Sequence, residues 1–160
     1  MLQLLWLALA LLIGGSVLIV IGLLSYLVRR WKEVVPPESA AARFQQQREH
    51  LEADFLRAAT RSGKPRGLRW KHCDWANEVV LARDRKNGEL TALVGVKIQF
   101  EAIEGSDMEG LPAVGTLRNA SAVFAFDGRA NWRPTGRAIF NLNPDEVLTR
   151  FKDQFQPLVR

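Results

Sequence analysis

The first 28 residues contain no Asp, Glu, Lys, Arg or His, and most of them are apolar. A helix that crosses a bilayer needs about 20 apolar residues, because the hydrocarbon layer is about 30 Å thick and each helical residue rises about 1.5 Å. The alternative is a cleaved secretory signal, but no basic side chain precedes this stretch and no small-residue cleavage pattern follows it. The sequence therefore predicts a transmembrane anchor over residues 1–28.

Basic and aromatic residues flank the predicted span. Cations next to a span tend to stay on the cytoplasmic side, and here they follow the span rather than precede it. Aromatic rings prefer the headgroup level. We therefore expect a single-pass protein of the cell membrane whose C-terminal domain is cytoplasmic. The predicted anchor residues are Trp6, Tyr26, Arg29, Arg30, Trp31 and Lys32.

Small residues recur every seven positions within the span, at Ala8, Gly15 and Gly22. Such a stripe lets a second helix approach closely. Glycine is also common in spanning helices, and the segment has no GxxxG motif. The stripe therefore predicts no more than a weak homo-association.

Residues 29–62 read as a juxtamembrane basic segment followed by a helical connector. Pro36 and Pro37 interrupt any helix that continues from the span. Residues 38–61 are rich in good helix formers, with most of their apolar residues in the second half. We expect that half to lie on a sheet and the Gln-rich first half to form a polar spur. A coiled coil is disfavoured, because Gln47 and Asp54 fall at its core positions.

Residues 63–160 change to strand-like alternation and predict a small α+β domain. Apolar residues occupy every second position from Leu90 to Ala102, which is typical of a strand with one buried face. Asn87-Gly88 before it predicts a hairpin with a type I′ turn, and Asp127-Gly128 predicts a second hairpin. Pro134 is expected to break or bulge the returning strand.

A C-terminal helix is expected after Asn143, which has the position of an N-cap. Pro144 suits the first helical position, and Glu146 is where a capping box needs an acid. Its apolar face would continue to Phe155. The expected fold is thus an N-terminal transmembrane helix, an amphipathic helix, an antiparallel four-stranded meander of two hairpins and a C-terminal helix, with the helices on one sheet face. This element order resembles the cystatin-like or NTF2-like arrangement, and no motif accompanies the resemblance.

The sequence carries no recognisable catalytic, metal or cofactor motif. His72 and Cys73 are adjacent on an expected strand, so their side chains point to opposite faces and His72 cannot activate the thiol. The acids Glu101, Glu104, Asp107 and Glu109 lack the spacing of a calcium loop. We expect no catalytic residues, no bound metal and no cofactor.

The net charge of +5 divides into +2 for residues 29–62 and +3 for residues 63–160, which is too little for nucleic-acid binding. One acid-free cluster is a candidate contact for anionic lipid. Trp and Arg near the second hairpin are candidate partner contacts, because both are enriched at interaction hot spots; the alternative for the tryptophan is a core position. The lipid candidates are Arg61, Lys64, Arg66, Arg69 and Lys71, and the partner candidates are Arg129, Trp132, Arg133 and Arg137.

These features favour a membrane-anchored, non-catalytic module that binds an unidentified protein partner or supports assembly at the membrane surface. Anchoring would raise the effective concentration of such a module without new contacts. The alternative is a small-ligand-binding or hydrolytic domain with an apolar pocket between helix and sheet. Its expected lining residues are Trp70, Trp75, Phe100 and Phe124.

Overall fold

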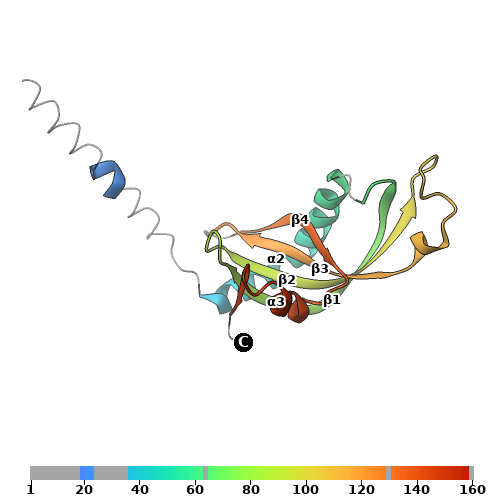
Figure 1. Ribbon diagram of the computed structural model, residues 1–160. Coiled ribbons are helices and arrows are strands. Elements are labelled where there is room, and N and C mark those ends of the chain that lie inside the picture. Colours follow the sequence, from blue (N-terminus) through green and yellow to red (C-terminus); the bar gives the residue numbers. More distant parts are fainter. Residues whose placement is uncertain (1–18, 24–35, 63–64, 129–130, 159–160) are drawn as a thin grey trace, which may run out of the picture. The chain divides into compact units, whose positions relative to one another are not determined.

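The computed structural model of the protein describes residues 19–23, 36–62, 65–128 and 131–158 (Figure 1). The chain divides into two compact units, Met1–Val34 and Val35–Arg160. Residues 19–23 are helical, and no helix among the described residues is long and apolar enough to span a bilayer. The rest of the predicted span lies outside the described residues. So do the six predicted anchor residues Trp6, Tyr26, Arg29, Arg30, Trp31 and Lys32, and Ala8 and Gly15 of the small-residue stripe.

The second unit is an α+β domain built on one antiparallel sheet with the strand order β4-β3-β2-β1-β5. Its first four strands form the predicted meander, and the short β5 adds to the outer edge of β1. The sequence did not predict β5, because three residues are too few for a detectable alternation. The elements are α2 Pro37–Arg61, β1 Leu68–Asp84, β2 Leu90–Ala102, η1 Pro112–Gly115, β3 Arg118–Phe126, β4 Trp132–Phe140, α3 Pro144–Arg150 and β5 Phe155–Pro157.

Helix α2 packs on the sheet along its whole length, so the expected polar spur is wrong. Its buried residues are Ala40, Phe44, Leu51, Phe55 and Ala59, and Ala40 and Phe44 belong to the first half. The indole Nε1 of Trp132 donates to the Ala40 carbonyl at 2.9 Å. The backbone amide of Trp132 donates to Gln47 Oε1 at 3.2 Å. Strand β4 thus fastens the Gln-rich half of the helix to the domain.

The two helices lie on opposite faces of the sheet, which corrects the expectation that both cover one face (Figure 1). Alternate β2 residues from Leu90 to Phe100 form one core cluster with the buried face of α2. Leu93 points the other way and forms a second cluster with Val147 of α3 and Phe155 of β5. Phe155 is therefore a strand residue, and α3 ends at Arg150, before the position the helical pattern predicted.

The sequence predicted the helix cap and the bulge in β4 correctly, but not the type of the turn between β1 and β2. Asn143 and Glu146 form the predicted capping box at the start of α3. The turn between β1 and β2 is not type I′, because Gly88 has φ +71° whereas Asn87 has no positive φ. Pro134 does bulge β4, since two residues are skipped between the pairs Val123–Arg137 and Phe124–Pro134.

Candidate functional site

The centre of the space between α2 and the sheet is filled by aromatic rings. Phe55 is fully buried, and its ring centroid lies 5.5 Å from those of Trp75 and Phe124 and 6.2 Å from that of Trp70. Trp70 also packs edge-on against Phe100 at 5.1 Å. The four residues expected to line an apolar pocket therefore contact one another and the helix. A ligand at the position of these four residues would have to displace their rings.

The edge of the sheet below α2 carries a wide bulge. Trp75 pairs with Val96 and Val79 pairs with Val94, so residues 76–78 of β1 lie opposite Gly95 alone. Glycine suits this position, because a Cβ on Gly95 would lie 3.3 Å from the Ala76 Cβ. The bulge turns backbone carbonyls away from the β-ladder, and those carbonyls need other donors.

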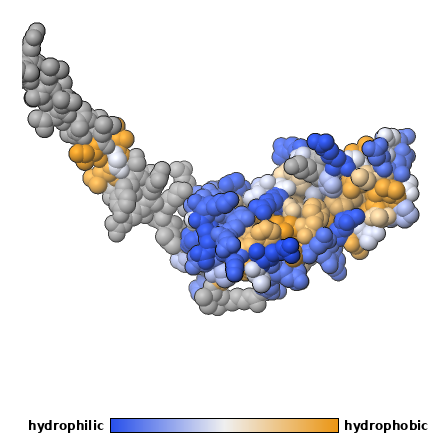
Figure 2. All heavy atoms as spheres, viewed as in Figure 1, coloured by the Kyte–Doolittle hydropathy of each residue, from blue (hydrophilic) through white to orange (hydrophobic). Residues whose placement is uncertain are grey.

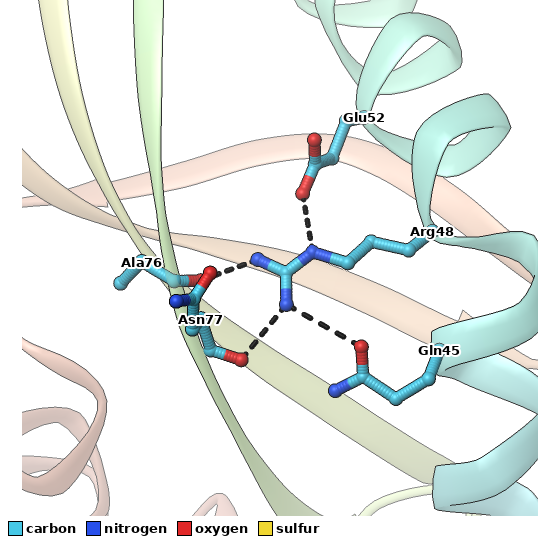
Figure 3. Close-up of polar contacts among 5 residues, drawn as sticks. All are labelled: Gln45, Arg48, Glu52, Ala76 and Asn77. Carbon is cyan, nitrogen blue, oxygen red and sulfur yellow. Dashed lines mark hydrogen bonds and ion pairs between the residues drawn. The ribbon is translucent and has the colours of Figure 1, made fainter.

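Arg48 of α2 supplies these donors (Figure 3). Its Nη1 donates to the Asn77 carbonyl at 2.8 Å, and its Nη2 donates to the Ala76 carbonyl. Its Nε donates to Glu52 Oε1 at 2.7 Å, one turn further along the helix. The rigid guanidinium thus joins the helix to the bulge, a role that the point charge of lysine cannot reproduce.

On the opposite side of the sheet from α2, the bulge forms one wall of an open groove of about 790 Å³. Gly95 lies on the floor of this groove. A Cβ at this position would lie 3.7 Å from the Pro144 Cδ at the start of α3. The other walls come from the η1 segment and from the loops that flank β3 and α3. Its lining side chains include Asp74, Lys97, Leu117, Asn119, Asn143 and Glu146.

Polar residues cross this groove in register. Asp74 pairs with Lys97 across β1 and β2, and Lys97 pairs with Asn119 across β2 and β3. The Asn141 amide then donates to the Asn119 carbonyl at 2.8 Å. The side chains of Asp74, Lys97 and Asn119 have no hydrogen bond or ion pair with any described residue. The groove therefore offers a carboxylate, an ammonium and an amide to a bound molecule.

The α3 end of the groove is rigid and already hydrogen-bonded. Asn143 Oδ1 accepts from the Glu146 amide at 2.9 Å, and Glu146 Oε2 accepts from the Asn143 amide at 2.7 Å. These two side chains shape the wall. Asn141 beside them has φ +60° and is the non-glycine residue with a positive φ in the described chain. Asparagine tolerates this conformation better than most residues.

The predicted partner contacts divide between core and surface. Trp132 is 4% exposed and packs on Phe44 and Phe126, so the structure assigns it to the core and its ring is not a surface anchor. Arg133 and Arg137 are exposed on β4, and Arg133 Nη2 lies 3.5 Å from Glu89 Oε2. Arg129 lies outside the described residues.

The predicted lipid contacts lie at the turn from α2 into β1. Arg61, Arg66, Arg69 and Lys71 are exposed, and Lys64 lies outside the described residues. The cluster is free of acids in sequence but not in space. Glu101 of β2 lies opposite Arg69, with Oε1 3.5 Å from Arg69 Nε and Oε2 3.8 Å from Lys71 Nζ. This acid reduces the positive potential that an anionic headgroup would meet.

His72 and Cys73 occupy opposite faces of β1. His72 is exposed, whereas Cys73 is half-buried and packs against the core. Burial raises the pKa of the Cys73 thiol to about 11 from its usual 9.0. The thiol therefore stays protonated near pH 7, which is the opposite of an activated nucleophile. No group of three or more His, Cys, Asp or Glu residues in the described chain is arranged to hold a metal ion.

No known protein family, curated protein sequence or solved structure matches the chain. The groove was not predicted from the sequence, although Gly95 within a strand and the asparagines at positions 119, 141 and 143 are signals for it. Only the strand register brings those positions together.

Proposed function

We propose that the protein is a membrane-anchored binding module whose partner protein docks in the groove on the α3 side of the sheet. The observation that carries this proposal is the row of Asp74, Lys97 and Asn119 in a groove of about 790 Å³, three polar side chains that no described residue pairs with. Exposed Leu117 stands beside this row. A mixture of apolar contact and polar groups is typical of protein interfaces.

Binding is proposed rather than catalysis because of what lines the groove. The described lining residues include no Ser, Cys or His, the side chains that most often act as nucleophile or general base. The polar groups that are present can orient a partner. They are exposed and remain hydrated until a partner arrives, so charge complementarity there would contribute more to specificity and association rate than to affinity.

Photo-crosslinking in the membrane tests the docking site. A photoreactive amino acid at Asn119 is expected to form an adduct with one defined protein, and the same group at Glu49 on the exposed side of α2 is not. Lys97→Glu should reduce the Asn119 adduct about tenfold, since it reverses a charge in the groove. Lys86→Glu, in the exposed turn between β1 and β2, is the matched control. Equal adducts at Asn119 and Glu49 would refute the docking site.

A small polar ligand is the second candidate, favoured by a groove volume within the range of about 300–1,000 Å³ that ligand sites occupy. Native mass spectrometry of the full chain separates the two functions. One outcome would show that the groove binds a small ligand and not a partner protein. In that outcome the wild type retains a small molecule, Lys97→Glu does not, and no protein adduct forms at Asn119.

We also propose that residues 1–28 anchor the module in the cell membrane, with the domain on the cytoplasmic side. The basis is the uncharged stretch and the arginines that follow it. The full chain is expected to stay in the membrane pellet after alkaline carbonate washing, and a chain that begins at Pro36 is expected in the supernatant. Externally added protease should leave the domain intact in spheroplasts. Mature protein that begins after Val28 would contradict the anchor, and digestion from outside would reverse the orientation.

A further inference from the structure

The exposed apolar side chains of the domain are concentrated in one connection. Among the described residues of 36–158, every exposed large apolar side chain lies between β2 and β3, with 37% to 56% of its surface exposed. These side chains are Ile103, Met108, Leu111 and Leu117. Figure 2 shows apolar surface at the end of the domain where this connection lies. A concentration of this kind on an otherwise polar domain marks an interaction surface.

The same end of the domain carries charges of both signs. The connection contains Glu104, Asp107 and Glu109 and no basic residue. It packs against the turn that precedes β1, because the Gly67 carbonyl accepts from the Ile103 amide at 2.9 Å and from Ser106 Oγ at 3.0 Å. That turn carries exposed Arg66. Acids and a guanidinium therefore border one apolar patch.

Three of these neighbouring charges have no ion-pair partner in the described part of the chain. Arg66, Glu104 and Asp107 are exposed, and their side chains have no ion pair with any described residue. Arg69 and Lys71, slightly further along, do pair with Glu101. The patch is thus bordered by unpaired charges of opposite sign, and its acids disfavour an anionic lipid surface as the occupant.

A surface that holds both members of a charge pair around an apolar centre is complementary to itself. In a two-fold dimer each contact occurs twice, so Arg66 of one copy can meet the acids of the other copy while the apolar side chains are buried between them. We infer that the end face formed by residues 103–111 and Arg66 is a two-fold interface between two copies of this chain, which leaves Leu117 to the groove. The membrane anchor proposed for residues 1–28 would favour this pairing, because confinement to the membrane surface raises the effective concentration of the second copy.

The test is the oligomeric state of the full chain in detergent, measured by light scattering and sedimentation over a range of concentrations. The wild type is expected to dimerise. Met108→Asp with Leu111→Asp, and separately Arg66→Glu, are each expected to weaken dimerisation about tenfold or more. Arg66→Glu combined with Asp107→Arg is expected to restore it, because the charge pair is reversed rather than removed. Lys86→Glu is the control at a different turn.

Rescue by the double reversal would support the charge pair, since a folding defect would not be repaired by a second surface substitution. Circular dichroism of each variant confirms that the domain stays folded. A monomeric wild type would overturn the inference. So would a dimer that resists every substitution in this face, which would point instead to the small-residue stripe of Ala8, Gly15 and Gly22. Groove variants such as Lys97→Glu are expected to remain dimeric, so this inference and the proposed function can fail separately.

Discussion

Replacing Phe55 with alanine is expected to lower the free energy of unfolding by about 3–5 kcal/mol, the largest effect of any substitution considered. The Phe55 side chain is fully buried at the centre of the aromatic cluster, in contact with Trp70, Trp75 and Phe124. Its removal loses the transfer free energy of the ring and leaves a cavity that neighbouring rings cannot collapse to fill. Urea unfolding of the full chain in detergent, followed by circular dichroism, measures the change.

Phe151→Ala is the matched control for this prediction. Phe151 follows α3 on the other face of the sheet and is half-buried, so the same truncation removes less buried surface. We expect it to cost about 1–2 kcal/mol, in proportion to the smaller apolar area lost. Equal losses at the two positions would show that the cluster under α2 is not the main source of stability.

Arg48→Ala is expected to lower the free energy of unfolding by about 1.5–3 kcal/mol, the second largest effect. The substitution leaves the Ala76 and Asn77 carbonyls without their guanidinium donor and Glu52 without its ion pair (Figure 3). Partial exposure lets water replace part of what is lost, which is why the expected cost stays below that of a fully buried pair. The same denaturation measurement applies.

Two conservative variants separate geometry from charge at this site. Arg48→Lys keeps the charge but loses the planar fork, so it should recover less than half of the loss. Glu52→Gln keeps an oxygen that can accept from Nε and should cost no more than about 1 kcal/mol. Amide exchange at residues 76–78 should quicken in Arg48→Ala. If lysine restored full stability, the fork would not be what holds the bulge.

Local signals predicted most of the helices and strands. The alternation from Leu90 to Ala102 identified β2 and the face that packs on α2, but not the burial of Thr91 and Leu93 on the other face, and Asn143 with Glu146 identified the start of α3. These features depend on neighbours in sequence, which is why they can be read from it. The same reasoning failed for Phe155, because a helical spacing of apolar residues does not reveal that the backbone turns after Arg150.

Contacts between distant residues decided the rest. From the sequence, Trp132 has two equal alternatives, a partner contact or a core residue. Its hydrogen bond to the Ala40 carbonyl, 92 positions away, shows that it belongs to the core. The polar residues of the Gln-rich half of α2 predict a spur. That half packs because Ala40 and Phe44 meet β4 there, and no local pattern contains β4.

The sequence by itself determined that an uncharged stretch precedes a small α+β domain, and which residues of that domain alternate between two environments. Charge and periodicity are properties of a chain and need no partner to be read. Only the tertiary structure decided that α2 and α3 cover opposite faces, that the interior is closed by rings and that a polar groove lies outside it. The groove depends on strand register, because Asp74, Lys97 and Asn119 lie side by side only when three strands are aligned.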